Sequence, residues 1–341
     1  MLAKRHHYLP QKAHLDFFCK DGLLCVYDAR TKQYRRQKPL NTAIETHYYS
    51  VEEDDGEKTA DIESLLAKVE NPIPRLLKRV EERQVLSAEN KVALSRFAAW
   101  FVVRVPAFEA SVNELSEKKT KLRLLAFCAD EKRMESKLAR FIQEQGRGAE
   151  VTASKVLEWI QRDKYRVVTH RNTSLSMMLS LAPTMAKWFE RMPWLLVCAP
   201  KKHSFVTTDN PFVLTAPPNR CKEKGFPFGV LTPGVGKILP LTQTTCLLMG
   251  NCGEEMNSED MNYIEVSHDL VKEINLSLTW NARRFVIARD EDLLRCLVKR
   301  VETNHRAIPP RERQDEWQII PLPLEFRENR DCAPTERTTK P

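Results

Sequence analysis

The sequence predicts an α+β fold: a predominantly helical middle packed on a small, mostly antiparallel sheet, with an N-terminal β-hairpin docked on it. Two observations carry this prediction. Through residues 57–192 apolar side chains recur every three or four residues, the period of amphipathic helices. From 193 to 301 the apolar runs become short and are bounded by Pro, Gly and Asn, as strands are. We therefore expect one compact domain over 1–301, in which 1–56 form the hairpin segment, and a polar C-terminal extension at 302–341 that ends in disorder.

The N-terminal segment predicts a short helix and then a hairpin. Pro10 is suited to the first turn of a helix, where a missing N–H costs nothing. Leu23 to Tyr27 is an apolar, β-prone run, 28–32 supplies a turn, and Gln33 to Arg36 returns as a polar edge strand. The acidic stretch from Val51 to Asp61 predicts an exposed loop.

The middle of the chain predicts a series of helices with recognisable ends. The first covers 62–69 and stops at Pro72 and Pro74, and Ser87 caps a second that breaks at Pro106. A long charged helix or helix pair follows over 108–145. Thr152 caps a short helix, and the last covers 167–189 with a kink at Pro183. In the long segment the periodicity predicts these side chains to point inward: Leu115, Leu122, Leu125, Leu138 and Phe141.

The last third predicts strands with two helices among them. Ser267 caps one of these helices and Asp290 the other. We expect strands at 194–198, 204–207, 237–240, 245–249, 263–266 and 284–288.

Composition excludes several classes of protein. Of 341 residues, 42% are hydrophobic and 29% charged, which fits neither a membrane-embedded nor a largely disordered chain. The start of the chain has no apolar run of the kind that a secretory signal needs, so we expect a cytoplasmic protein. The nine Cys include no Cys-x-x-Cys pair, and most lie in apolar runs, so reduced core thiols are expected.

Positive charge concentrates at the N-terminus. The net charge is +8, and residues 1–38 hold nine Lys or Arg against three Asp, whereas 41–70 hold nine acidic residues against two Lys. A basic face of this kind attracts a polyanion such as nucleic acid, although an ordinary solvated surface explains it equally well. The candidate nucleic-acid contacts are Lys4, Arg5, Arg35 and Arg36.

His7 is the first candidate catalytic residue. It follows His6 and two cations just before Pro10, and an imidazole can act near neutral pH as a general base or metal ligand. Adjacent histidines point different ways in extended chain, so one metal is unlikely to take both. A structural hydrogen bond or simple exposure are the alternatives for His7.

Asp209 and Asn210 are the other catalytic candidates. They follow an apolar strand and precede Pro211, a position where side chains are held firmly, but an Asx-turn before the proline explains them too. Asn275 shares a helix face with Val271 and Leu278, so it is expected to be buried and to need partners. It suits either a polar clamp on the Asp209 turn or a ligand contact.

Metal binding has only a weak signal. Glu63 and Glu70 lie seven residues apart on one helix face, which suits either a shared metal or plain solvation. No phosphate-binding Gly loop, Gly-x-Ser-x-Gly or His-Glu-x-x-His is present. A divalent metal therefore stays a possibility without assigned ligands.

Several short motifs resemble an uncharacterised, mainly bacterial family known as domain of unknown function DUF4238. The opening Lys4-Arg5-His6-His7-Tyr8-Leu9-Pro10-Gln11 and the strand ending in Tyr27-Asp28 are similar to its start. Further similar motifs lie at Arg104-Val-Pro106, Phe205 to Pro211, Leu239-Pro240-Leu241, Asn275 and Ala282 to Val286. The resemblance implies a bacterial or phage-associated cytosolic protein and brings no activity with it. We assign Arg104, with Asn275, a structural polar role.

These observations lead to two function hypotheses. The first is a nucleic-acid-directed hydrolase, with or without a divalent metal, that has a toxin or phage-defence role; it needs the fold to bring His7 and Asp209 to one cleft. The second is a non-catalytic module that binds a ligand or a protein partner.

Overall fold

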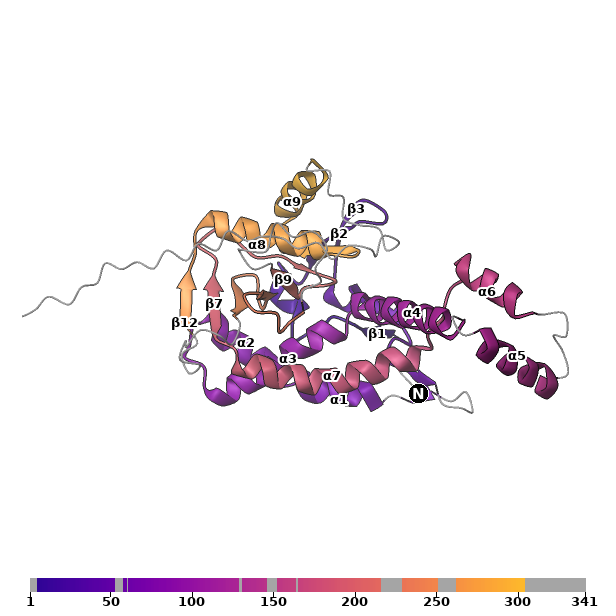
Figure 1. The fold of residues 1–341 in the computed structure, drawn as a ribbon. Helices are drawn as coiled ribbons and strands as arrows, with labels where there is room; N and C mark the ends of the chain where they lie inside the picture. Colours follow the sequence, from indigo (N-terminus) through magenta and orange to yellow (C-terminus); the bar gives the residue numbers. More distant parts are fainter. Residues whose placement is uncertain are drawn as a thin grey trace, which may run out of the picture.

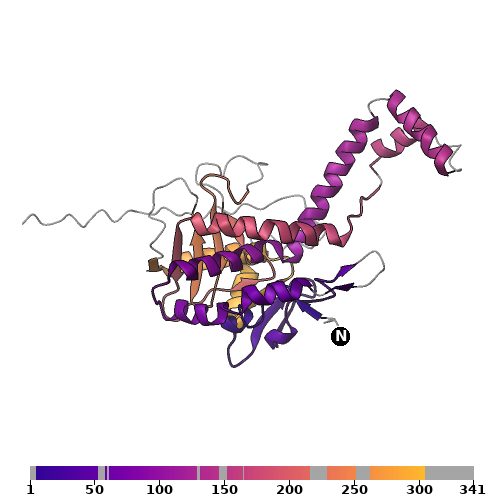
Figure 2. The same ribbon diagram turned by 90° about the horizontal axis from the view of Figure 1, so that it is seen from below.

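The computed structural model shows a three-layered body from which a helical arm projects (Figures 1 and 2). The layers are a group of helices, a central sheet and two further helices on its other side. The structure describes residues 5–52, 58–59, 61–128, 131–145, 152–163, 165–215, 229–250 and 262–303. The expected disorder of the C-terminal extension lies outside these residues. The predicted α+β class is confirmed.

A five-stranded sheet forms the middle layer. Its strand order is β12-β7-β11-β10-β9, with β7 parallel to β12 and the other pairs antiparallel. The predicted strands 194–198, 237–240, 245–249 and 263–266 are found within one residue, and β9 adds a strand that the sequence analysis missed. The bounds are β7 Trp194–Cys198, β9 Val213–Thr215, β10 Gly236–Pro240, β11 Thr245–Met249 and β12 Asn262–Glu265.

Both faces of this sheet are covered, which explains its continuous apolar strands. Leu196 and Leu247 point into the core shared with the long helices, whereas Val197 and Cys246 point into a second core under α8 (His268–Asn281). Alternate side chains of a strand point to opposite faces, so a strand buried on both sides must be apolar throughout. Figure 1 shows α8 on one side of the strands and α3 and α7 on the other.

Four helices cover the face of the five-stranded sheet that points away from α8. Ser87 caps α3 with a reciprocal bond to Asn90, as a capping box does. Of the helix pairs, α3 and α7 share the most extensive contact. Pro183 lies inside α7 and does not end that helix. The second helix, α2, was not predicted: Pro74 lies in its first turn, where it starts a helix instead of ending one. The bounds are α1 Asp61–Glu70, α2 Ile73–Glu81, α3 Ala88–Val103 and α7 Arg171–Arg191.

A four-stranded sheet joins the N-terminal hairpin to strands from the last 140 residues of the sequence. Its order is β3-β2-β13-β8, all antiparallel, so the predicted N-terminal hairpin β2–β3 pairs with the strand next to the last helix. The expected strand 204–207 is shorter here, because Ser204 to Val206 bond to loop and side-chain groups. The bounds are β2 Leu24–Asp28, β3 Gln33–Gln37, β8 Thr207–Thr208, β13 Phe285–Ala288 and α9 Glu291–Thr303.

Short elements complete the N-terminal region. The predicted helix after Pro10 is a 3-10 turn at Leu15–Phe18, and a second lies at Pro39–Asn41. The segment expected to be a loop contains two paired strands, so that prediction is wrong in part. Those two strands are β5 Val51–Glu52 and β6 Lys58–Thr59. Outside that segment, β1 Arg5–His7 pairs with β4 Ile44–Thr46.

The arm consists of the outer part of α4, with α5 and α6, and Figure 2 shows it extending from the body. It has a small core of its own, in which Cys128, Met134, Ala153 and Ile160 are buried. The inward orientation predicted for this segment is wrong at four of its five positions: Leu115, Leu122, Leu125 and Phe141 are exposed, and Leu138 is half-buried. A projecting helix has too little protein around it to cover both of its faces. The bounds are α4 Pro106–Cys128, α5 Glu131–Gln145 and α6 Ala153–Gln161.

Two predictions of a general kind can be compared with the described residues. None of their helices is long and apolar enough to cross a membrane. Their cysteines are free, and four are buried, but Cys296 is exposed on α9, which corrects the expectation of a core thiol there.

Candidate functional site

Five arginines line one pocket, which N-terminal segments form together with the start of α4 and the segments around residues 209 and 283. Its volume of about 340 Å³ is in the range of small-molecule sites, roughly 300–1,000 Å³. Five parts of the chain build it: the β1–β4 pair, the β2–β3 hairpin, the first turns of α4, the residue after β8, and the turn that leads into β13. We call it the arginine pocket. Its charged lining residues are Arg5, Arg30, Arg35, Arg283, Arg284, Glu45, Glu114 and Asp209.

Asp28, at the end of β2, holds two of these arginines in place. Its carboxylate is fully buried and accepts bonds from Arg284 Nε and Nη2 at 3.0–3.2 Å, from Arg35 Nη2 at 3.1 Å and from Arg30 N at 3.1 Å. Burial alone would raise the pKa of Asp28, but the bonds from Arg284 and the Arg30 backbone and the two positive charges outweigh it and lower that pKa. Asp28 therefore stays ionised and fixes both guanidinium groups.

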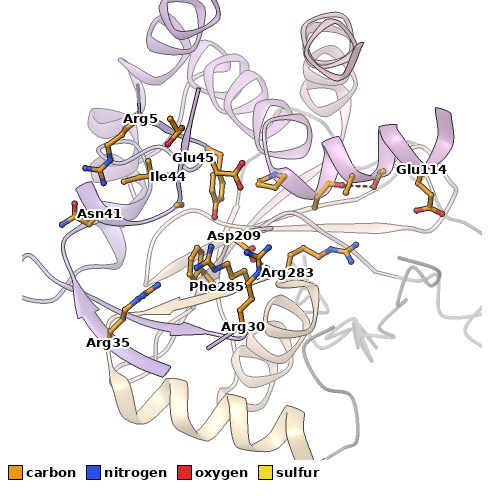
Figure 3. A pocket seen from close by; sticks show the side chains of 18 residues that line it. Arg5, Arg30, Arg35, Asn41, Ile44, Glu45, Glu114, Asp209, Arg283 and Phe285 are labelled. Carbon is orange, nitrogen blue, oxygen red and sulfur yellow. Dashed lines mark hydrogen bonds between the residues drawn. The ribbon is translucent and has the colours of Figure 1, made fainter. Parts of the chain in front are cut away.

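Phe285 and Arg283 complete the arginine-lined side. The Phe285 ring lies 4.4 Å from the Arg284 guanidinium carbon and 5.7 Å from that of Arg35, within cation–π range. Arg283 Nε is buried, and no acceptor meets it among the described residues. A buried donor without an acceptor costs free energy, so an anion that accepts from Arg283 would remove that cost. Figure 3 shows Arg30 and Arg283 beside Asp209 and Phe285.

Asp209 is the buried one of the three carboxyl groups that line the pocket. It follows β8 and is only 4% exposed. Its own N–H donates to the Phe285 carbonyl at 3.1 Å, and its Oδ1 accepts from Arg283 N at 2.8 Å. Burial raises the pKa of Asp209 to about 6, although backbone bonds from Arg283, Arg284 and Phe285 act in the other direction. The carboxyl group therefore changes charge close to neutral pH.

His7 does not line the pocket, although its neighbours Arg5 and Tyr8 do. Its Nε2 lies 3.2 Å from the Leu40 carbonyl, and its own carbonyl accepts from Arg104 Nη2 at 2.9 Å. Burial, followed by the charge of Arg104, lowers the pKa of His7, so the ring is neutral at pH 7. The segments around His7 and Asp209 thus meet at one pocket through Tyr8 and Asp209, but His7 itself is not one of the lining residues.

Arg104 is a buried link between three parts of the chain. Besides His7, it donates to Glu70 Oε1 at 2.6 Å and to the Tyr49 hydroxyl at 3.2 Å. Arg104 is 2% exposed, and these partners keep its charge satisfied. Arg104, the residue directly after α3, therefore links β1 to α1.

Asn210 and Asn275 bond to backbone groups. Asn210 Nδ2 donates to the Asn281 carbonyl at 3.2 Å, and Asn281 Nδ2 returns a bond to the Asn210 carbonyl at 2.7 Å. Asn275 accepts from Val206 N and donates to the Ser204 carbonyl, both at 2.9 Å. Neither asparagine lines the arginine pocket. Both hold the chain that leads into and out of Asp209.

The cations predicted from sequence are distributed unevenly. Arg5 and Arg35 line the pocket, Arg36 is exposed on β3 outside it, and Lys4 lies outside the described residues. The sequence analysis missed Arg30, Arg283 and Arg284 as site residues. Only their positions in the sequence could have indicated these residues. Arg30 follows the strand that ends at Asp28, and Arg283 and Arg284 directly precede a buried strand.

The two glutamates considered as metal ligands have separate cationic or imidazole partners. Glu63 Oε1 lies 3.4 Å from His6 Nε2, and Glu70 binds Arg104. The two carboxylates therefore have different protein partners and are neither merely solvated nor arranged around one shared metal. Among the described residues, no group of three or more His, Cys, Asp or Glu side chains is arranged to hold a metal ion.

Comparison with family models decides the kinship of the chain. The model of a family described as "Protein of unknown function (DUF4238)" matches residues 5–292. The chain belongs to this family. The resemblance inferred from short sequence motifs is thus confirmed, and the match to DUF4238 spans every residue that lines the arginine pocket. No curated protein and no solved structure matches the chain.

Proposed function

We propose that this protein binds nucleic acid through the arginine pocket and hydrolyses a phosphate ester there. The observation that carries the proposal is the convergence of five arginines on one pocket. Guanidinium groups match phosphate oxygens in charge and geometry, and they pair with them through two parallel bonds. Arg35 and Arg284 are fixed by Asp28, so they are positioned before a ligand arrives. Such prepositioned donors also stabilise charge that develops on a reacting phosphate.

Asp209 supplies the acid–base chemistry of this proposal. A general base works best when its pKa lies near the working pH, and that of Asp209 is raised to about 6. Water attacks the phosphorus atom, its proton passes to Asp209, the bond to the leaving oxygen breaks, and that oxygen takes a proton from solvent. A hydrolase of this kind damages nucleic acid in the cell that makes it, which suits a toxin or phage-defence role.

Binding is tested with a single-stranded oligonucleotide that carries no terminal phosphate, followed by fluorescence anisotropy over a salt series. Arg30→Ala and Arg283→Ala are expected to weaken binding, and each lost phosphate contact should lower the salt slope by about 0.7. Arg36→Ala is the matched control, because Arg36 lies on the same hairpin but outside the pocket. A flat salt dependence, or an equal loss in Arg36→Ala, refutes binding at this pocket.

Asp209 makes the affinity pH-dependent in a predictable direction. Below pH 6 its carboxyl group becomes neutral, so repulsion of a phosphodiester falls and binding should strengthen. The probe lacks a phosphate monoester, whose own pKa near 6 would obscure the effect. In Asp209→Asn this strengthening between pH 7.5 and 5.5 should vanish. An unchanged pH profile in that variant would show that another group is responsible.

Hydrolysis is tested on DNA and RNA with Mg²⁺, with Mn²⁺ and with EDTA. Asp209→Asn is expected to abolish cleavage while retaining binding, and to remove toxicity on expression. Cleavage that survives in Asp209→Asn would remove Asp209 from the mechanism.

The second candidate function is a binding module without catalysis. One observation favours it: Asp209 Oδ1 already accepts a hydrogen bond from the Arg283 N–H. This bond uses one of the two carboxylate oxygens that would otherwise accept a proton from water. Salt-sensitive binding without cleavage under all three metal conditions would establish this alternative.

A further inference from the structure

The outer part of α4 presents a stripe of leucines to solvent. Leu115, Leu122 and Leu125 are 61%, 67% and 43% exposed. At about 3.6 residues per turn they fall within about 80° of one another on the helix. Isolated exposed leucines are common, but three along one helix face form an apolar strip that is typical of an interaction surface.

The other face of the same helix is already covered. Leu124 and Phe127 pack against the small core that contains Met134 and Ile160. By helical geometry Leu124 lies opposite Leu115, so α5 and α6 cover the side away from the leucine stripe. Lys121 holds this arrangement through Asp163, at 2.7 Å, beyond the end of α6. The arm therefore has its internal packing, and the leucine stripe remains exposed to solvent.

Charge along α4 is separated into two halves. Residues 106–117 carry Glu109, Glu114 and Glu117 and no Lys or Arg. Residues 118–128 carry four basic residues and no acidic ones, namely Lys118, Lys119, Lys121 and Arg123. Glu114 and Glu117 pair with Lys118 and Lys121 one turn further along the same helix, so what distinguishes the two halves is their net charge. A helix with a negative and then a positive half is complementary to a reversed copy of itself, because each acidic half then faces a basic half.

We propose that the leucine stripe of α4 binds the same stripe of a second copy of this chain, with the two helices antiparallel. A two-fold axis brings one patch against itself, which suits a single self-complementary strip. Antiparallel pairing also places the two bodies at opposite ends of the paired arms, because each arm extends away from its own body (Figure 2). The inference is independent of any ligand in the arginine pocket.

The leucine contact is tested by analytical ultracentrifugation of the full chain over a dilution series. The wild-type chain is expected to sediment as a dimer that dissociates on dilution, and Leu122→Glu as a monomer. Val168→Glu is the matched control, since Val168 is 91% exposed and lies outside the stripe. A wild-type monomer throughout, a dimer in Leu122→Glu, or dissociation caused equally by Val168→Glu overturns the proposal.

The orientation is tested by charge reversal. Glu117→Lys alone, and Lys118→Glu with Lys119→Glu, should each weaken the antiparallel homodimer, and an equal mixture of the two variants should restore association as a heterodimer. Added salt should weaken the wild-type dimer. A parallel pair would respond oppositely, because Glu117→Lys and added salt would both relieve repulsion between like halves. Strengthening of the dimer by either change therefore overturns the antiparallel arrangement.

Discussion

The arginine pocket and the helical arm both depart from the usual rule that charged side chains are exposed and leucines are buried. The pocket buries a charged group, and the arm exposes an apolar one. In the pocket a charged carboxylate, Asp28, has no exposed surface, whereas in the arm Leu122 is 67% exposed. Buried charge is retained only with partners, and three arginines donate to Asp28. The stripe on the arm lacks such compensation within the chain. The comparison teaches that one region is prepared internally for a small charged ligand, while the other needs an external apolar partner.

The largest effect is expected from Asp28→Ala. It leaves two guanidinium groups without their shared carboxylate, and breaking such a buried pair costs about 3 kcal/mol of unfolding free energy or more. Arg35 and Arg284 keep about 40% of their surface exposed, so we expect the lower end of that range. Urea unfolding followed by circular dichroism measures it. If Asp28→Ala costs no more than Arg36→Ala on the same sheet, the pocket is not held together by Asp28.

A smaller effect is expected from His14, a buried ring in the body. Its Nε2 lies 2.7 Å from the Thr207 hydroxyl, and burial, with the charge of Arg104, lowers its pKa to about 3. The unfolded chain therefore binds the proton more tightly, so stability is lost as pH falls below about 6.5. Asp209 has the opposite sign, because burial raises its pKa and favours the folded state at lower pH.

Comparison with a non-titrating variant separates these two contributions. Between pH 7 and pH 5, His14→Gln should gain about 2 kcal/mol of unfolding free energy relative to the wild-type chain, since only the wild-type loses the His14 contribution. The measurement is the difference between the two pH slopes, so any constant packing cost of the substitution cancels. Parallel slopes would mean that His14 titrates normally.

The smallest effect is expected from Leu122→Ser on the arm. At a dilution that keeps the chain monomeric, the substitution should change the unfolding free energy by no more than about 0.5 kcal/mol, because the side chain is already in water. Met134→Ala, at a buried position of the same arm, should cost about 2 kcal/mol or more. A large loss in dilute Leu122→Ser would show that the stripe packs within its own chain and would end the comparison.

The sequence predicted best those features that depend on neighbouring residues. Ser87, Thr152 and Ser267 cap the helices that were predicted from them, since a cap bonds to backbone two or three residues away. The hairpin before Gln33 likewise follows from a local turn. Proline was harder to interpret: Pro74 starts a helix, and Pro183 lies within one.

The candidate site could be predicted only in part. Asp209, Arg5 and Arg35 were singled out and do line one pocket, but no sequence pattern joined them to Arg283 or Arg30. Arg30 and Arg283 come from segments more than 200 positions apart, and they reach the same pocket because β2 pairs with β13. The sequence analysis placed His7 in the site because it adjoins charged residues, whereas the register of β1 with β4 leaves it facing Leu40.

The sequence by itself determined the α+β class, most helix ends and strand positions, the basic N-terminus and membership of the family, because periodicity, caps and short motifs are written in adjacent residues. Only the tertiary structure decided which charges meet and which apolar side chains stay in water. Helical periodicity marks one face of α4 as apolar, but whether that face is buried depends on what packs beside it. In the same way, five arginines become one pocket only when Asp28, buried by the pairing of distant strands, draws two of them together.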